Sequence, residues 1–170
     1  MCSVQSRLGA KSVRVTTAFQ YTGFTPKAPR RLLNNARRES YQALGQHFFD
    51  TNLPWRFTFF GQKLLGYKKR TNKYNRRKKR EKGHLLPLVW EGTTRDRVLS
   101  PLTKIKAFAT SRNSHVDLTL NAPTLNLRAN ASSPNLREEI TRVSNREVGP
   151  LESILQKTTE SNFQKLEEGA

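Results

Sequence analysis

Hydrophobic and polar residues alternate in three stretches of the chain, which is the pattern of β-strands with one buried face. The first stretch covers residues 12–21 and ends at the turn-forming pair Thr22-Gly23. The other two, residues 103–110 and 115–121, are separated by a short polar segment that predicts a hairpin loop. We therefore expect a small, mainly antiparallel β-sheet.

A long helix is predicted for residues 29–50, because apolar residues recur there at helical spacing while most of the arginines fall off the apolar stripe. The stripe comprises Leu33, Ala36, Leu44 and Phe48. Thr25 and Pro26 offer a start for this helix, as an N-cap and a first-turn proline.

A second long helix is predicted at the C-terminus, where the apolar stripe comprises Val148, Leu151, Leu155 and Leu166. The sequence Ser144-Asn145-Arg146-Glu147 fits a capping box at its start. Pro150 follows soon afterwards, so the helix either kinks at this residue or begins there. The expected fold class is α+β, with both helices packed on the sheet.

The remaining segments have shorter patterns. Trp55, Phe57 and Phe59 alternate with polar residues after Pro54, which predicts an extended piece whose aromatic side chains fill the core. Further extended segments are expected at residues 85–90, 125–131 and 137–143. Residues 1–11 are expected to be a flexible N-terminus, followed by a single domain from 12 to 168 that includes a basic arm or loop at 68–84.

Charge changes this picture at the basic arm. Ten of the fifteen residues from 68 to 82 are Lys or Arg, and Glu81 alone opposes them, so this stretch carries half of the formal net charge of +18. Lys and Arg neutralise phosphates and release counterions without reading base sequence. The predicted nucleic-acid-binding residues are Lys68, Lys69, Arg70, Lys73, Arg76, Arg77, Lys78, Lys79, Arg80 and Lys82. The alternative interpretation is a solvated charge run without a partner.

The conformation of the basic arm follows from the same charges. Like charges four residues apart, such as Lys69 and Lys73 or Arg76 and Arg80, oppose an isolated helix. We therefore expect a mobile arm, or a helix that orders on contact with its partner.

Other chemistry is poorly represented. The single cysteine, Cys2, and the three widely separated histidines favour neither a disulfide framework nor a metal site. Neither a phosphate-binding loop nor a nucleophile elbow is present, and no catalytic set can be assembled, so we expect a non-enzymatic protein without a cofactor. Apolar runs are too short to span a membrane. The first acidic residue is Glu39, and an acid-free N-terminus is compatible with a mitochondrial presequence, but the alternation in residues 12–21 favours a strand.

The order of these features resembles a known family. The relevant segments are Trp55-Arg56-Phe57-Thr58-Phe59-Phe60-Gly61, Gly66-Tyr67-Lys68-Lys69-Arg70, Tyr74, Arg77-Lys78 and Gly83-His84-Leu85-Leu86-Pro87-Leu88-Val89-Trp90-Glu91-Gly92. Together with the hairpin and the C-terminal helix, they resemble the virion-morphogenesis, tail-completion and neck proteins of tailed bacteriophages. The match extends over residues 30–168, and Pro87-Leu88-Val89 with Gly92 has the family's fixed spacing, although Glu91 stands where the family often has threonine.

The resemblance implies a structural subunit of the head-tail connector in the virion. Such a subunit assembles as a homo-oligomeric ring between portal and tail, with portal or adaptor and tail proteins as partners and no membrane. The basic segment would then contact the backbone of packaged DNA without sequence specificity. The net charge of −2 in residues 135–170 suits a second surface that meets protein.

An RNA-binding structural protein of a ribosome or mitoribosome is the alternative, because basic arms on small α/β bodies are common there. Ribosomal proteins usually spread their bases over much of the surface. Here the bases cluster in the first half of the chain, which favours the virion interpretation.

Overall fold

The structure is a computed structural model that describes residues 4–8, 13–17, 29–67, 69–110, 113–120 and 136–168. It confirms the predicted α+β class: the long N-terminal helix and the C-terminal helix pack against an antiparallel hairpin. The internal contacts divide the chain into two compact units. One comprises residues 1–48, 104–119 and 145–170, and the other comprises 49–103 and 120–144. The boundaries of a single domain, 12–168, stay a prediction.

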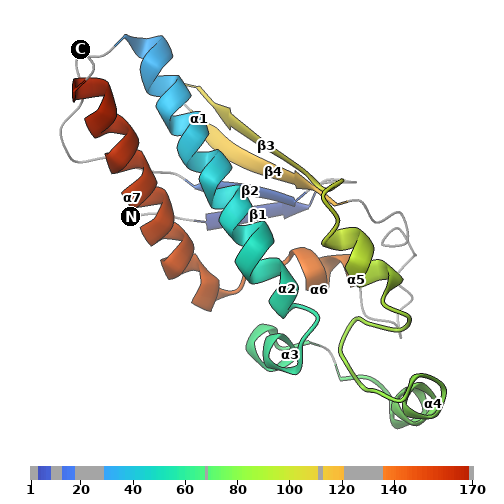
Figure 1. Cartoon of the computed structure of the whole chain (residues 1–170). Helices are drawn as coiled ribbons and strands as arrows, with labels where there is room; N and C mark the ends of the chain where they lie inside the picture. The colour runs from blue at the N-terminus through green and yellow to red at the C-terminus, as the bar shows by residue number, and fades with distance from the viewer. Residues whose placement is uncertain are drawn as a thin grey trace. The chain divides into compact units, whose positions relative to one another are not determined.

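The first unit combines two long helices with a sheet (Figure 1). Helix α1 (Arg30–His47) runs beside α7 (Asn145–Glu168) and also contacts the hairpin of β3 (Lys104–Ala109) and β4 (Ser114–Thr119). Strands β1 (Val4–Leu8) and β2 (Val13–Thr17) extend the sheet in the order β1-β2-β4-β3, and every pairing is antiparallel. The strand predicted in residues 12–21 is confirmed as β2, whereas β1 occupies part of the N-terminus for which no strand was predicted.

The hairpin has one apolar face because residues at alternate positions share a side of the sheet. Val116 pairs with Ala107 and Leu118 with Ile105, and the two β4 side chains are fully buried. Helix α1 approaches this face closely at Gly45, where a Cβ atom would lie 2.6 Å from Ile105 Cγ2 and 2.7 Å from Val116 Cγ2. The missing side chain at residue 45 therefore sets the distance between helix and hairpin.

Helix α7 contains Pro150 and does not begin there. The helix begins at Asn145 and contains Pro150 in its second turn, where the ring removes one backbone donor. Its inward stripe repeats every four residues and comprises Leu151, Leu155, Thr159 and Phe163. A polar bridge joins α7 to α1: Asn162 Nδ2 donates to Ser40 Oγ at 3.1 Å and to the Ala36 carbonyl at 3.3 Å.

The packing of α7 can be tested at Leu155, whose side chain is only 2% exposed. Leu155→Ala is expected to lower the free energy of unfolding by about 2–5 kcal/mol, because it removes buried methyl groups and leaves a cavity. Urea unfolding of the variant measures this loss. Ser153→Ala, at an exposed position of the same helix, is the control and should change little. An unfolding curve for Leu155→Ala that overlays the wild type would contradict the observed packing.

The second unit differs most from the sequence predictions. After α1 the chain passes through a π-helical turn (Phe48–Asn52) into α2 (Leu53–Trp55), and α3 (Phe59–Leu65) follows. The predicted extended piece at Trp55–Phe59 is therefore wrong. Thr58 caps α3, since its Oγ1 accepts the Gly61 N–H at 3.1 Å, and Gly66 ends the helix at φ 60°.

The aromatic side chains of this segment also lie differently from the prediction. Phe57 is buried, but Trp55, Phe59 and Phe60 are 41%, 56% and 62% exposed. Trp55 and Phe60 contact each other edge to face with ring centroids 5.7 Å apart. A strand would bury these alternating side chains on one face, whereas Trp55 ends α2, Phe57 lies in the turn that follows and Phe59 begins α3.

Two further strand predictions are wrong. Residues 85–90 form no strand; the backbone turns at Pro87 and Leu88, and Leu88 adopts φ 57°. Residues 136–141 form the short helix α6 (Leu136–Thr141), and α5 (Thr93–Val98) was not predicted. The expected extended segment at 125–131 and the helix start at Thr25-Pro26 lie outside the described residues.

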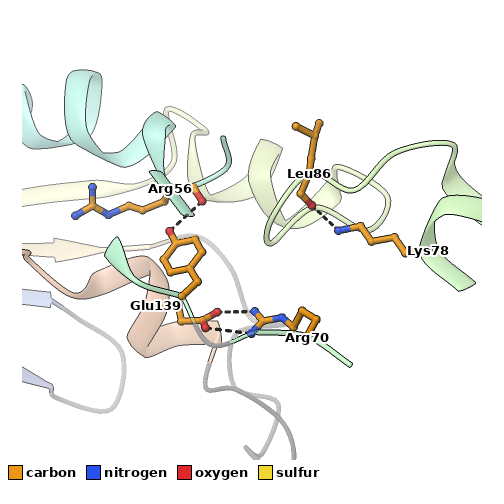
Figure 2. Close-up of polar contacts among 6 residues, drawn as sticks. Arg56, Arg70, Lys78, Leu86 and Glu139 are labelled. Atoms are coloured by element: carbon orange, nitrogen blue, oxygen red, sulfur yellow. Dashed lines mark hydrogen bonds and ion pairs between the residues drawn. The ribbon is translucent and has the colours of Figure 1, made fainter. Parts of the chain in front are cut away.

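Arg56 holds the core of the second unit together. Its side chain is fully buried and donates from Nε to the Ile140 carbonyl at 2.9 Å, from Nη2 to the Arg142 carbonyl at 3.0 Å and from Nη1 to the Asn52 carbonyl at 2.5 Å. The Tyr67 hydroxyl donates to the Arg56 carbonyl at 2.9 Å (Figure 2). These bonds tie α2 to the end of α6, more than eighty residues later in the chain.

Candidate nucleic-acid interface

The predicted basic arm is a helix, α4 (Asn72–Lys82), with a cap at each end. Thr71 Oγ1 accepts the Tyr74 N–H at 3.2 Å at the N-terminus. Gly83 ends the helix at φ 71°, and its N–H donates to the Lys79 carbonyl at 3.0 Å. Caps of this kind satisfy backbone groups that a helix end leaves without partners, and so they offset the repulsion between like charges.

The bases of α4 divide between two sides of the helix. Positions 73, 76, 77 and 80 follow the helical repeat and share one exposed side, with Lys79 on its border. We call this set the basic face; it comprises Lys73, Arg76, Arg77, Lys79 and Arg80. From Lys73 to Arg80 the basic face covers about 10 Å of the helix axis, at a rise of about 1.5 Å per residue. The cations are thus held at high density on one surface.

The opposite side of α4 packs on the segment that follows it. Tyr74 and Trp90 lie with ring centroids 5.4 Å apart. Lys78 is buried, and its Nζ donates a hydrogen bond to the Leu86 carbonyl (Figure 2). Lys82 Nζ lies 2.9 Å from Glu91 Oε1. These contacts fix the rotation of the helix, and therefore the direction in which the basic face points.

Lys78 and Lys82, two of the predicted site residues in α4, thus contact residues outside the helix. Arg70, which precedes α4, also has an intramolecular partner. Arg70 pairs with Glu139 through both nitrogens, Nη2 to Oε2 at 2.6 Å and Nη1 to Oε1 at 3.1 Å (Figure 2). Both side chains are largely buried. Lys69 is exposed, and Lys68 lies outside the described residues. The structure therefore gathers five of the ten predicted residues on the basic face and gives Arg70, Lys78 and Lys82 intramolecular partners.

Glu81 is the one acidic residue of α4, and it moderates the basic face. Arg77 Nε donates to Glu81 Oε1 at 2.7 Å, across one turn of the helix. This hydrogen bond lowers the pKa of the Glu81 carboxyl and raises the pKa of the Arg77 guanidinium. Arg77 also lies over the Trp90 ring, at 5.5 Å from its centroid. Arg77 is consequently the most constrained cation of the basic face.

Burial shifts the pKa values of two groups on the inner side of α4, the side that packs on the following segment. It lowers the pKa of the Lys78 ammonium, and the positive charge of Arg70 lowers that pKa further. Burial raises the pKa of the Tyr74 phenol, with the charge of Arg70 opposing the rise. In both groups the folded protein disfavours the charged form, as desolvation requires.

The shift at Lys78 predicts a pH dependence of stability. Between its lowered pKa and the ordinary value of 10.5, the unfolded chain binds more protons at this residue than the folded chain. The contribution of Lys78 to the free energy of unfolding should therefore rise as the pH rises through that window. At pH values below the window, the full cost of burying the charged ammonium remains. Urea unfolding of wild type and Lys78→Met across this window should show a steeper rise for the wild type.

The hydrogen bond to Leu86 does not confuse this comparison. The loss of this hydrogen bond in Lys78→Met lowers the free energy of unfolding by the same amount at every pH, because a neutral amine also donates. Tyr74 is present in both proteins, so its own titration cancels in the difference. Parallel pH profiles would contradict the desolvation of Lys78.

The residues that support α4 were missed in the sequence analysis. Trp90, Glu91 and Glu139 position the basic helix, but their partners lie up to 69 residues away in sequence. Two local signals were available: Thr71 three residues before Tyr74 as an N-cap, and Arg77 with Glu81 at helical spacing. Both signals favour a formed helix over a mobile arm.

Comparisons with known proteins add no relative: no family model, curated protein or solved structure matches this chain. Within the described ranges, no three His, Cys, Asp or Glu side chains are grouped so that they could hold a metal ion. None of the helices in those ranges is long and apolar enough to cross a membrane. The candidate site is the basic face of α4, where five exposed cations share one side of a capped helix.

Proposed function

We propose that this chain is a non-enzymatic structural protein of the head-tail connector, or neck, of a tailed bacteriophage, and that it contacts the phosphates of packaged DNA through the basic face of α4. In this proposal the chain assembles as a homo-oligomeric ring between portal and tail, with portal or adaptor and tail proteins as neighbours. The observation that carries the contact with nucleic acid is the set of five exposed cations on one side of a capped helix. The placement in a virion rests on the resemblance of residues 30–168 to neck proteins.

The basic face supports contact with phosphate in particular. Arg and Lys side chains in this arrangement present several donors to one surface, and each neutralised phosphate releases counterions. Contacts from these cations to phosphates fix position on the nucleic acid and carry no sequence information by themselves. Non-specific contact is what a subunit lining a DNA channel requires.

The exposed aromatic residues of α2 and α3 support membership of an assembly. Trp55, Phe59 and Phe60 leave apolar surface in contact with water in the chain by itself. Clustered apolar exposure of this kind marks surfaces that other macromolecules cover. In the proposed ring, neighbouring subunits or connector proteins are the candidates.

The proposal is tested by sedimentation of a native lysate on a density gradient, with the protein followed by antibody before and after nuclease treatment. Migration with tailed or DNA-filled particles that withstand added nuclease is the expected result, since packaged DNA is enclosed. Migration with ribosomal particles that collapse under RNase would replace the proposal with the RNA-binding alternative. A slow-sedimenting monomer in both samples would contradict both.

A further inference from the structure

We infer that the basic face of α4 selects double-stranded over single-stranded nucleic acid. The inference rests on the proposed function, because it assumes that this face binds nucleic-acid phosphates. It adds a preference that follows from three properties of the face: its charge density, its rigidity, and the position of the aromatic rings around it.

Charge density favours a duplex. From Lys73 to Arg80 the helix rises about 10 Å, at about 1.5 Å per residue. A duplex presents one negative charge per about 1.7 Å of its axis, or about six charges over that length, whereas one strand presents about three. Five cations on this length of helix match the charge of the duplex more closely than that of a single strand.

Rigidity favours the same ligand. The caps at Thr71 and Gly83 hold the ends of α4, and Lys78 and Lys82 hold its inner side. The cations therefore project from a fixed frame and fit phosphates that are themselves fixed in space. A duplex is stiff over about 150 base pairs, so its phosphates need no ordering, whereas a single strand loses conformational freedom when it binds a fixed array.

The position of the aromatic rings separates the two ligands further. Proteins that bind single strands combine a basic groove with exposed aromatic rings on which bases stack. Tyr74, the aromatic residue of α4, instead contacts Trp90, with Lys78 Nζ 5.8 Å from the centroid of its ring. The ring of Tyr74 is 37% exposed, but it lies outside the basic face, whose five members are all cations. The basic face itself therefore offers cations to phosphates and no ring to a base.

The experiment compares a short DNA duplex with one of its own strands, chosen to lack self-complementarity, as fluorescent probes for the full chain in an anisotropy titration. With five contacts on the duplex and about three on the single strand, raising the salt concentration from 50 to 200 mM should weaken duplex binding about 500-fold and single-strand binding about 20-fold. At low salt the duplex should bind at least about tenfold more tightly, because it makes more contacts and releases more counterions per contact. Replacing the five residues of the basic face with glutamine should abolish this preference.

Three results would overturn the inference, and they differ from one another. Equal or tighter binding of the single strand would overturn it while leaving the proposed function standing. If Phe59→Ser with Phe60→Ser then weakened single-strand binding alone, the exposed aromatic residues would be the stacking surface instead. A duplex preference that survives loss of the basic face would place the selectivity outside α4. Failure of both probes to bind would overturn the proposed function itself.

Discussion

Replacing the five cations of the basic face with glutamine is expected to remove most of the affinity of this chain for nucleic acid. Release of five counterions contributes about 10⁴-fold to binding at 0.1 M salt, and the slope of log K against log salt should become shallower by about 4.5. An anisotropy titration with a DNA duplex at several salt concentrations measures both quantities. The substituted residues are Lys73, Arg76, Arg77, Lys79 and Arg80.

The fold should survive these substitutions. Glutamine is a good helix former, and removing like charges at helical spacing relieves repulsion within α4. Lys78 is kept in the variant, because it is buried and bonded to the Leu86 carbonyl. An unchanged circular dichroism spectrum and unfolding transition would show that any loss of binding reflects the missing charges.

A matched control changes the same number of exposed cations elsewhere in the chain. The control residues lie on α1 and α7, and they are Arg30, Arg31, Arg38, Lys157 and Lys165, each replaced with glutamine. Both variants lose five charges, so a general effect of net charge would weaken both equally. Equal salt slopes for the two variants would reject the basic face as the phosphate contact.

Replacing Arg56 with methionine is expected to destabilise the second unit by about 3–5 kcal/mol, because buried carbonyl groups would lose their donors. The three acceptors belong to Ile140, Asn52 and Arg142. A loss of this size is a large fraction of the stability of a typical domain. Chemical denaturation gives the free energy of unfolding, and hydrogen exchange should show the largest loss of protection in α2 and α6.

Arg142 provides the control for this experiment. Its carbonyl accepts a bond from Arg56, but its own side chain is exposed. Arg142→Met therefore removes a guanidinium near the same network without removing the donor, and should change stability by less than about 0.5 kcal/mol. If both variants unfold like the wild type, the Arg56 side chain does not hold α2 to α6.

The sequence predictions succeeded where a pattern was long and regular. The alternation at residues 103–110 and 115–121 predicted β3 and β4. The periodicity at 29–50 predicted α1, and the apolar stripe from Val148 to Leu166 predicted α7. In these elements one face packs against a neighbour over many residues, so burial itself imposes the period. The predictions failed for residues 55–59 and 137–143, where a few apolar residues fitted a short strand but short helices and the turns next to them formed. At that length the two periods are not distinguishable.

The candidate site shows a similar division. The ten bases of residues 68–82 were identified from composition, but their separate roles were not. Arg70 and Lys78 are indistinguishable from Arg76 in a list of charges, yet one pairs with Glu139 and the other bonds to the Leu86 carbonyl. Their partners are set by the packing of the second unit.

By itself, the sequence determined the α+β class, the two long helices, the hairpin and the place along the chain where positive charge is concentrated. Those features depend on local periodicity and composition, which any segment carries wherever it packs. Only the tertiary structure decided which side of α4 faces water and that Arg56 lies in a core. It also decided that Trp55, Phe59 and Phe60 are exposed. These outcomes depend on contacts between segments far apart in sequence, and the energy of such a contact exists only after the chain has brought both segments together.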